Sequence, residues 1–318
     1  MLPLRHPGVP SIKGVTRRYA SLATQVEISI IIPVFNQRLE LLQCLRALAQ
    51  QTYQTSRFEV IVVDNNSDDP IGDLTEQFPF ARCLHEPKRG SYAARNRGID
   101  ASGGELIGFT DADCLPAADW IERGVTAVRQ LPEGGMIGGR IEPTSRDPEK
   151  PTAAELYDCV VGYTQDSFIR WGFAATANLF TTRATIAQMG RFDETLMSGG
   201  DTEWGQRLRA RGLAQKYADD VRVFHPARRT LRELFRRVLR IAGGNQQLAD
   251  QRGEGTADLL GYAWRELIQL RRLRVNVWND RLDSVSRKLK FAAVVWVVDL
   301  LRTVERYRVH YGGTPRRT

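Results

Sequence analysis

Cysteine is scarce in this 318-residue chain, and long apolar runs are absent. The four cysteines, Cys44, Cys83, Cys114 and Cys159, lie far apart and form no Cys-x-x-Cys pair. The sequence therefore predicts neither a disulfide framework nor a zinc site, and it favours a reducing compartment. No segment approaches the roughly 20 apolar residues of a membrane-spanning helix. Residues 1–26 carry basic side chains but no apolar core of signal-peptide length, so we expect a cytoplasmic protein.

Acidic residues are outnumbered by basic ones, 37 against 45, which gives a formal net charge of +8. This balance permits nucleic acid, an anionic membrane surface or a phosphorylated substrate as a partner, and does not choose among them. No recognised nucleic-acid-binding module is present, so we expect no nucleic acid partner. Internal repeats and low-complexity segments are absent as well, which leaves an ordinary globular composition.

What the sequence does contain is an alternation of strands and helices. Apolar runs bounded by glycine, proline or polar residues predict strands, and apolar residues repeating at three and four predict helices. The predicted strands cover residues 28–36, 58–63, 82–85, 106–109, 134–141 and 221–224, and Pro33 is expected to end the first ladder. The predicted helices cover residues 39–51, 71–78, 90–103, 117–130, 201–212, 256–275 and 282–309, and residues 143–152 predict a loop. This order predicts an α/β protein with a mostly parallel sheet.

Polar side chains follow three of the predicted strands. Asn36 follows the first strand, Asp64 the second, and Asp111 with Asp113 the fourth. Open α/β sheets bind ligands at the carboxyl ends of their strands, so we expect these side chains around one crevice. Two carboxylates one residue apart supply hard oxygen ligands for a divalent cation that also holds a substrate's phosphates. The alternative is a surface turn rich in Asp.

The region after residue 229 is rich in arginine and leucine. Arg236, Arg237 and Arg240 form a cluster, which is interpreted as a contact to a diphosphate, a contact to an acidic lipid surface, or a solvated helix face. The last predicted helix carries apolar side chains along one side: Val285, Leu289, Ala292, Trp296, Leu300, Val304 and Tyr307. We expect these helices to lie on a membrane, to cap the domain before them, or to form a dimer contact.

Five segments together resemble the family 2 glycosyltransferases, which have the GT-A fold. They are Ser29-Ile-Ile-Ile-Pro-Val-Phe-Asn36, Val60-Ile-Val-Val-Asp64-Asn-Asn-Ser-Asp68, Ala94-Arg95-Asn96-x-Gly98, Phe109-x-Asp111-Ala-Asp113 and Gly200-Asp201-Thr-Glu203-Trp-x-x-Arg207-Leu. Each is weak alone, but they occur in the family's order and approximate spacing. The resemblance implies a Rossmann-like mixed, mostly parallel sheet flanked by helices. It divides the chain into a lead-in (1–26), a GT-A catalytic domain (27–228) and a C-terminal helical region (229–318).

The resemblance also implies a site for a nucleoside-diphosphate sugar, with a UDP-sugar favoured. The residues that it assigns to nucleotide-sugar binding are Pro33, Phe35, Asn36, Asp64, Arg95, Asp111 and Ala112. Among them, Asp64 matches the acid that hydrogen-bonds the base, and an ionised carboxylate is a suitable acceptor for a ring N–H. Arg95 is assigned to the ribose or a phosphate, with a surface salt bridge as the alternative.

The family's metal and base residues are matched as well. Asp113 matches the direct ligand of Mg²⁺ or Mn²⁺, a cation that offsets charge on the departing diphosphate. His225 is either a further ligand or a structural histidine. Asp201 matches the base of an inverting transfer, which takes the proton of the acceptor hydroxyl; the family's usual Glu-Asp pair is Gly200-Asp201 here. The remaining candidates for diphosphate or acceptor contacts are Asn178, Glu203, Trp204 and Arg240.

We therefore expect a metal-dependent inverting glycosyltransferase that acts on a saccharide or lipid-linked hydroxyl acceptor, in surface or exopolysaccharide assembly. A nucleotidyltransferase of similar sheet topology needs a glycine-rich loop after the first strand, and Asn36-Gln-Arg38 contains no glycine. A basic nucleic-acid-binding protein would place acid-tipped strands against phosphates. Intact Asp64, Asp113 and Asp201 argue against an inactive scaffold.

Overall fold

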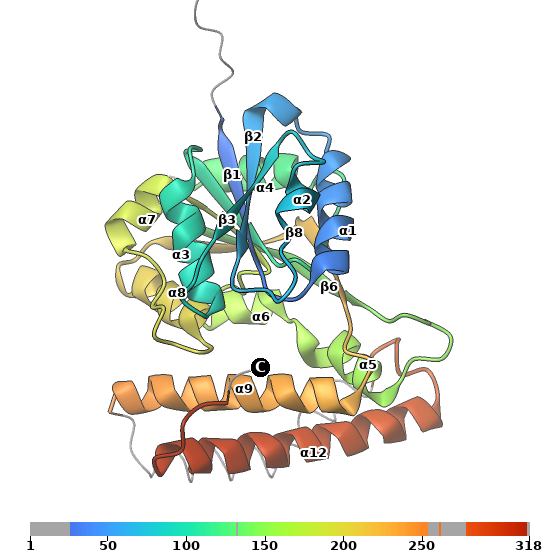
Figure 1. Cartoon of the computed structure of the whole chain (residues 1–318). Helices are drawn as coiled ribbons and strands as arrows, with labels where there is room; N and C mark the ends of the chain where they lie inside the picture. Colours follow the sequence, from blue (N-terminus) through green and yellow to red (C-terminus); the bar gives the residue numbers. More distant parts are fainter. Residues whose placement is uncertain (1–25, 132, 254–260, 262–277, 317–318) are drawn as a thin grey trace, which may run out of the picture.

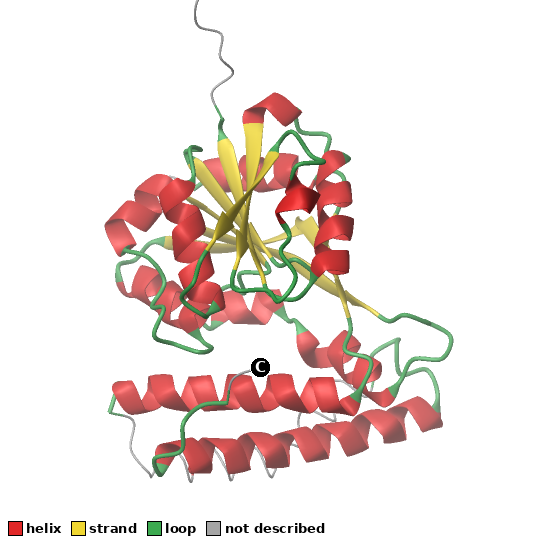
Figure 2. Ribbon diagram, viewed as in Figure 1, coloured by secondary structure: helices red, strands yellow, loops and turns green. Residues whose placement is uncertain are grey.

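The computed structural model describes residues 26–131, 133–253, 261 and 278–316. Its centre is one eight-stranded sheet with helices on both faces and two long helices across one end (Figures 1 and 2). The strands are β1 (Ile28–Val34), β2 (Phe58–Asp64), β3 (Ala81–His85), β4 (Leu106–Thr110), β5 (Leu115–Pro116), β6 (Gly135–Thr144), β7 (Asn178–Thr182) and β8 (Ala214–Pro226).

The helices fall into three groups: those on the two faces of the sheet, short helices between strands, and the long C-terminal pair. They are α1 (Arg38–Ala49), η1 (Thr55–Arg57), α2 (Gly72–Thr75), α3 (Ser91–Ala101), α4 (Trp120–Arg129), α5 (Ala153–Tyr157), the π-helical turn η2 (Asp158–Gly162), α6 (Gln165–Arg170), α7 (Arg183–Met189), α8 (Gly200–Ala210), α9 (Leu231–Gln251) and α12 (Val285–His310).

The strand order is β3-β2-β1-β4-β7-β6-β8-β5. The first four strands in this order are mutually parallel, β7 and β5 run antiparallel to their neighbours, and β6 and β8 pair in parallel. The predicted mixed, mostly parallel sheet is therefore confirmed. Because β1, β2 and β4 are parallel to one another, their carboxyl ends lie at the same edge of the sheet. This edge faces α9 (Figure 1).

The sheet alternates its side chains between two cores. Along β1, Ile28, Ile30 and Ile32 enter a core shared with α1 and α4, and Ile31 enters a core shared with α3, α7 and α8. This two-residue alternation is the normal consequence of strand geometry. Both faces of β1, β2 and β4 are buried, which explains why these strands are almost continuously apolar in sequence.

Gly124 shows how tightly α4 packs on the sheet. A Cβ at this position would lie 2.3 Å from two ring atoms of Phe180 in β7. The ring of Phe180 also packs against Trp120 of α4, with the ring centroids 4.8 Å apart. The absence of a side chain at Gly124 therefore lets the helix approach an aromatic layer that any larger residue would push away.

Several predicted boundaries were wrong. β1 continues past Pro33 to pair Val34 with Asp64, because β4 pairs β1 only as far as Ile31 and the missing N–H of Pro33 breaks no bond on that side. β6 extends into the predicted loop 143–152, and helix α2 is shorter than predicted. β7 was not predicted, and β8 begins seven residues before the predicted strand, at Ala214. The predicted helix 256–275 lies almost wholly outside the described residues.

Helices α9 and α12 lie side by side and form a third core with α5 (Figure 1). α9 begins at a capping box, in which the Thr230 hydroxyl accepts from the N–H of Glu233 and the Glu233 carboxylate accepts from the N–H of Thr230. The inward side of α12 includes Phe291, Val295 and Val298. Its outward side is a row of exposed apolar residues: Val285, Leu289, Trp296, Leu300 and Val304. None of the helices in the described ranges has the length and hydropathy needed to cross a bilayer.

Candidate active site

A cavity of about 1840 Å³ lies between the carboxyl edge of the sheet and helices α9 and α12. The sheet side contributes the ends of β1, β4 and β8, and α3 and α8 add one wall. Residues from all of these elements line it, including Pro33, Phe35, Asp111, Asp113, Asp201 and His225. Residues far apart in sequence therefore meet in one space, where an open α/β sheet normally binds its ligand.

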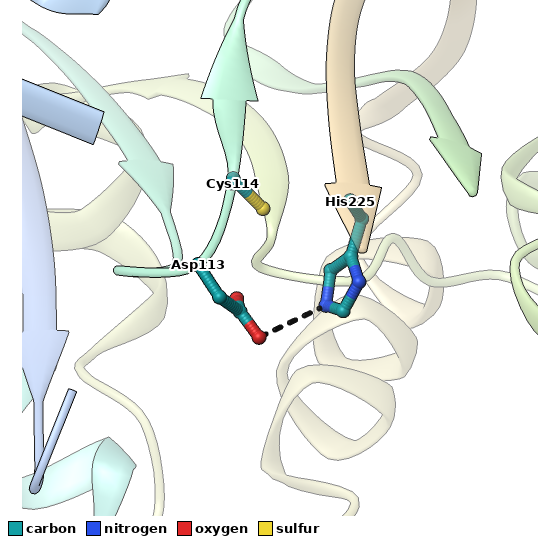
Figure 3. Close-up of side chains that lie close together, drawn as sticks. All are labelled: Asp113, Cys114 and His225. Atoms are coloured by element: carbon teal, nitrogen blue, oxygen red, sulfur yellow. Dashed lines mark ion pairs between the residues drawn. The ribbon is translucent and has the colours of Figure 1, made fainter. Parts of the chain in front are cut away.

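Asp113 and His225 lie side by side at one wall of this cavity and point toward each other (Figure 3). Asp113 follows β4, and His225 lies near the end of β8. The Asp113 Oδ2 atom is 3.5 Å from the His225 Nε2 atom. The other ring nitrogen, Nδ1, lies 2.8 Å from the carbonyl oxygen of Pro226. A carbonyl oxygen can only accept, so Nδ1 carries a hydrogen, and in the neutral imidazole Nε2 then presents a lone pair.

This pair fits a divalent cation. Two ligands of one cation bound at about 2.1 Å lie roughly 3 Å apart, close to the separation observed. Burial raises the pKa of the Asp113 carboxyl, and the Asp111 carboxylate nearby acts in the same direction. A cation would stabilise the ionised form of Asp113, and carboxylate oxygen with imidazole nitrogen suits Mn²⁺ or Mg²⁺.

Cys114 lies close to these two residues but does not fit the same role. The ligand atoms of Asp113, Cys114 and His225 lie within 4.8 Å of one another. The Cys114 thiol is fully buried and lies 3.8 Å from the carbonyl oxygen of Ala177, and burial raises its pKa well above the ordinary value. A thiol that stays protonated is a poor metal ligand, so the donor set is that of Asp113 and His225.

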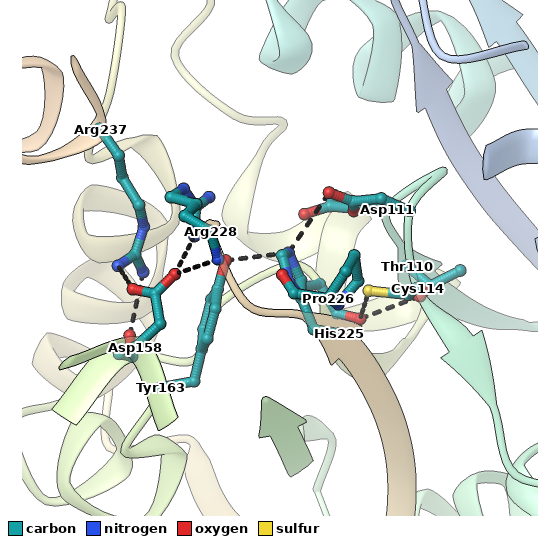
Figure 4. Close-up of polar contacts among 12 residues, drawn as sticks. Thr110, Asp111, Cys114, Asp158, Tyr163, His225, Pro226, Arg228 and Arg237 are labelled. Atoms are coloured by element: carbon teal, nitrogen blue, oxygen red, sulfur yellow. Dashed lines mark hydrogen bonds and ion pairs between the residues drawn. The ribbon is translucent and has the colours of Figure 1, made fainter. Parts of the chain in front are cut away.

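Tyr163 is the third partner of His225. Its hydroxyl lies 3.0 Å from Nε2, and since Nδ1 holds the ring hydrogen, the phenol donates to the lone pair of Nε2 (Figure 4). Burial raises the pKa of Tyr163, which keeps the phenol protonated and able to donate. The Arg237 guanidinium stacks on the other side of this ring, 4.5 Å from its centroid.

Arg228 and Arg237 share one buried acid. Arg228 donates from its backbone N–H and from Nη1 to Asp158 Oδ2, both at 3.0 Å, and Arg237 Nη1 lies 3.4 Å from Asp158 Oδ1 (Figure 4). Asp158 is fully buried in the π-helical turn η2. One carboxylate thus holds two arginines at the wall of the cavity beside His225, and leaves this side with a positive charge.

Asp201 lines the cavity from another element, in the first turn of α8. Its Oδ1 atom accepts from the backbone N–H of Thr202 at 2.9 Å and from the Tyr92 hydroxyl at 3.3 Å. In the described part of the chain both bonds go to Oδ1, which leaves Oδ2 as an acceptor toward the cavity. Burial raises the pKa of Asp201, while Arg95 and the two hydrogen bonds oppose that shift. A carboxyl with a raised pKa is a stronger base than an exposed aspartate.

Arg95 connects this wall to the end of β4. It is 4% exposed, and its Nη2 atom forms an ion pair with Asp111 Oδ1 at 2.6 Å. Its guanidinium also lies 5.7 Å from the centroid of the Tyr92 ring. An exposed salt bridge was the alternative to a ribose or phosphate contact for Arg95; a salt bridge is present, but the arginine is buried, and the pair fixes the position of Asp111 at the cavity.

Three other predicted site residues, Asn36, Asp64 and Ala112, lie near the ends of β1, β2 and β4 and do not line the cavity. Asp64 ends β2, and its Oδ1 atom accepts from the N–H of Ser67 at 3.0 Å. The neighbouring Asn65 lines the cavity, and Asp64 does not. Asn36 has a positive φ of 54° and exchanges hydrogen bonds with Asp68. Ala112 is fully buried in the core beneath Asp113 and Asp111.

Asn178, Glu203 and Trp204 correct the predictions made for them. Asn178 is fully buried, and its amide bonds Trp120 Nε1 and the carbonyl oxygens of Arg140 and Val221. Trp204 is buried in the core, with Nε1 bonded to the Gly190 carbonyl. Glu203 pairs with Arg207. None of the three lines the cavity, because each already serves packing or helix stability.

Sequence reasoning missed Tyr92, Asp158, Tyr163 and Arg228. No local signal marks Asp158 and Tyr163, which stand at the two sides of a π-helical turn. Arg228 follows His225 closely in sequence, and this spacing was the one available hint. Of the predicted arginine cluster, Arg237 and Arg240 line the cavity, and Arg236 is exposed.

A family model described as "Glycosyl transferase family 2" matches residues 29–186. Glycosyltransferase AglE of Haloferax volcanii is 37% identical over 277 residues, which cover 85% of this chain and 80% of that protein. The pre-mycofactocin glycosyltransferase of Mycobacterium tuberculosis is 27% identical over 267 residues, 80% of this chain and only 52% of the relative.

Two solved structures share the fold. The mannosyltransferase PcManGT from Pyrobaculum calidifontis, in complex with GDP-Man and Mn²⁺, superposes with a TM-score of 0.63 at 16% identity, over 89% of this chain and 86% of the other. S. aureus TarS 1–349, in complex with UDP-GlcNAc, superposes with a TM-score of 0.53 at 16% identity, over 91% and 93%. At this identity the likeness shows a common architecture.

Proposed function

The chain belongs to glycosyltransferase family 2, and from that premise we propose that it transfers a sugar, with inversion, from a nucleoside-diphosphate sugar to a hydroxyl acceptor in a reaction that uses a divalent cation. The observation that carries this proposal is the arrangement of Asp113 with His225 on one wall of the cavity and Asp201 on another. One wall suits a cation and a diphosphate. The other suits removal of a proton.

The donor nucleotide is assigned to the β1 and β2 end of the cavity. Pro33 and Phe35 line it, and Phe35 is 44% exposed, which offers an aromatic face to a base. Asp64 and Asn65 stand at the end of β2, where a carboxylate and an amide can accept from base and ribose. We favour a UDP-sugar. The neighbouring structures contain GDP-Man and UDP-GlcNAc, which supports a nucleotide sugar without choosing the base.

Asp113 and His225 are the residues that would hold Mn²⁺ or Mg²⁺. The cation would supply charge neutralisation for the diphosphate that leaves. Arg228 and Arg237, fixed by Asp158 beside His225, add positive charge on the same side. Arg95 orients Asp111 toward the ribose or the cation's water ligands.

Asp201 is the proposed base. Its Oδ1 atom is held by Thr202 and Tyr92, so the orientation of the carboxylate is set before an acceptor arrives. Its Oδ2 atom accepts the proton of the acceptor hydroxyl as that oxygen attacks the anomeric carbon opposite the diphosphate. Attack on the face opposite the leaving group inverts the configuration, and one carboxylate is sufficient for this step.

We propose that the acceptor is a saccharide or is lipid-linked, and that the enzyme acts in surface or exopolysaccharide assembly. It would act at the cytoplasmic face of the membrane. The exposed apolar row of α12, with Lys290 beside it and Trp278 81% exposed, supports peripheral membrane contact. On this proposal residues 27–228 carry the chemistry, and residues 229–318 complete the cavity and meet the membrane.

The test is a thermal-shift and hydrolysis screen with UDP-, GDP- and dTDP-sugars, each with Mn²⁺, Mg²⁺ or EDTA. We expect one nucleotide to stabilise the protein only with metal and to release nucleoside diphosphate slowly. Release of pyrophosphate from a nucleoside triphosphate and a sugar phosphate would instead identify a nucleotidyltransferase. Transfer that is undiminished in EDTA would contradict the role of the cation.

A further inference from the structure

Arg240 is a half-buried cation that forms no ion pair with a carboxylate in the described part of the chain. It projects from α9 into the cavity, and its Nη1 atom lies 3.3 Å from the hydroxyl oxygen of Ser198. Its Nε atom is buried without a hydrogen-bond partner among the described residues. A guanidinium taken out of water is unfavourable unless an anion compensates it. The position of Arg240 therefore calls for an anionic group in the cavity.

Three of the arginines that line the cavity, Arg228, Arg237 and Arg240, fall into two groups by their partners. Arg228 and Arg237 share Asp158 and stand beside Tyr163 and His225, on the side of the proposed cation. Arg240 bonds Ser198, which precedes Asp201 by three residues. The first group faces the donor's diphosphate. Arg240 instead contacts the segment that carries the base, where the acceptor hydroxyl must lie.

The close contact between α9 and this segment is built into the sequence. A Cβ at Gly244 would lie 2.6 Å from the backbone oxygen of Ser198. On the other side of the segment, Gly199 has a φ of +85°, a conformation that favours glycine. These two glycines let α9 lie against the loop before Asp201, which brings Arg240 to the acceptor side.

The wall beyond Arg240 is apolar and basic. Met197, Ile241 and Leu248 line it, and Arg252 stands at its far end. Arg252 lies twelve residues after Arg240, about 18 Å along the helix. Asp201 is the one carboxylate among the described residues that line this part of the cavity. An anionic group attached to an apolar or extended body fits such a wall.

We infer that this part of the cavity binds a phosphate group of the acceptor substrate, with Arg240 as its anchor. The inference rests on the proposed function, since it assumes that Asp201 faces the acceptor. The phosphate could belong to a lipid-linked acceptor or to a soluble sugar phosphate, and both would place an anion at Arg240 and a hydroxyl or oxygen near Asp201.

The experiment measures binding to the full chain with the donor side already filled by UDP and Mn²⁺. The probes are octyl phosphate, glucose 1-phosphate and inorganic phosphate, each titrated calorimetrically. Arg240→Gln should weaken binding of the phosphate probe about 10- to 100-fold, because a charge-assisted bond is lost, while the Kd of UDP with Mn²⁺ stays within twofold. Arg240→Lys should recover part of the loss. Arg123→Gln, an exposed arginine of α4, is the matched control and should change neither value.

Asn245→Asp tests the same wall without removing a buried side chain. Asn245 lines the cavity from α9 and is exposed, so the change preserves size and should leave folding intact. The added negative charge should weaken the binding of octyl phosphate severalfold. This result would support the inference even if Arg240→Gln failed to fold.

The outcomes separate the two proposals. Tighter binding of octyl phosphate than of the other probes identifies a lipid phosphate, and tighter binding of glucose 1-phosphate identifies a soluble one. If Arg240→Gln weakens UDP with Mn²⁺ and leaves the probes unchanged, Arg240 serves the donor and the inference is wrong. If no probe binds the wild-type complex, it is also wrong. If UDP with Mn²⁺ does not bind at all, the proposed function itself fails.

Discussion

The Tyr163 hydroxyl donates to the Nε2 atom of His225 over 3.0 Å, so a phenol uses the lone pair that a cation at Asp113 would need. Loading of the proposed site therefore requires this hydrogen bond to break. Tyr163 also lies under Arg237 and directly after the turn η2. Tyr163, which occupies the Nε2 atom of His225, is therefore also in contact with Arg237, one of the arginines proposed to face the diphosphate.

Tyr163→Phe should raise the affinity for Mn²⁺. The ring and its stacking with Arg237 remain, and the competing hydrogen bond is removed. Since such a bond contributes about 1 kcal/mol, the Kd of Mn²⁺ should fall about fivefold. Electron paramagnetic resonance of free Mn²⁺, with saturating UDP, measures it. Tyr157→Phe, another tyrosine of the same cavity, is the control. An unchanged Kd in Tyr163→Phe would show that Nε2 is not a ligand.

Asp113→Asn should remove metal dependence. The amide keeps the size of the side chain but loses the charge that a cation needs. Loss of a residue that hydrogen-bonds a metal ligand commonly costs about 10- to 100-fold in metal affinity or activity. Loss of a direct ligand should therefore cost at least about 100-fold. The readouts are the Mn²⁺ Kd and nucleotide release. Asp119→Asn, an exposed acid before α4, should behave as wild type.

Asp201→Asn should lower transfer about 10²- to 10⁴-fold, the usual contribution of a positioned base, with little change in the Kd of UDP with Mn²⁺. Glu203→Gln is the matched control, because Glu203 pairs with Arg207 away from the cavity. Transfer by Asp201→Asn at the wild-type rate would eliminate Asp201 as the base.

The pH dependence follows from the same residue. Burial raises the pKa of Asp201, so the acid limb of kcat/KM should lie above the normal range of an aspartate, and activity should fall as the pH drops through it. The raised pKa also means that the folded state binds the proton more tightly than the unfolded state. Stability is then lost as the pH rises from the pKa of Asp201 in the unfolded chain through its higher pKa in the folded protein. Asp201→Asn should therefore unfold at a higher temperature than wild type at neutral pH. A lower melting temperature would contradict the buried, costly carboxylate.

Asp158→Asn should destabilise the fold by about 3 kcal/mol, because it leaves two largely buried arginines without their shared acid. Urea unfolding at neutral pH measures the change. Asp166→Asn breaks an exposed pair with Arg170 and should cost less than about 0.5 kcal/mol. Equal effects of the two variants would mean that η2 is not held by this network.

Gly124→Ala should cost about 1 to 3 kcal/mol, since the added methyl meets the Phe180 ring in a filled core. Gly72→Ala is the comparison. No atom lies within 4 Å of a Cβ at Gly72, and alanine is the better helix former, so that variant should be neutral or slightly stabilised. Thermal unfolding of both proteins separates crowding from helix propensity.

Apolar patterning was sufficient to predict the parallel half of the sheet, because β1, β2 and β4 are buried on both faces. β8 was recognised only in its last part: residues 214–220 include Lys216, Asp219 and Asp220, which are exposed side chains on a paired backbone. β7 was missed because it follows a stretch of small residues and begins with Asn178. In both cases neighbouring strands hold the backbone, except at the irregularity between Ala218 and Arg222 that contains Asp219 and Asp220, and local composition does not reveal this.

Residues that line the cavity were predictable where they stand at the end of a strand or the start of a helix. Asp113, Asp201 and His225 occupy such positions, and all three line the cavity. Asn178 and Trp204 misled the prediction, since a sequence does not reveal whether a polar group turns toward ligand or toward a buried carbonyl. Asp158 and Tyr163 could not be found, because their role depends on contacts with Arg228 and His225 about 60 to 70 residues away.

The cavity has two walls that come from different parts of the chain, the sheet edge before residue 227 and the helix pair after residue 230. On the proposed assignments, the first wall holds the donor and the base, and the second adds Arg237 on the diphosphate side and Arg240 for the acceptor's phosphate. Recombination between relatives at this junction could therefore exchange recipients while the donor is retained. If α9 and α12 of one such enzyme were grafted onto another, the specificity for the acceptor would be transferred with these helices.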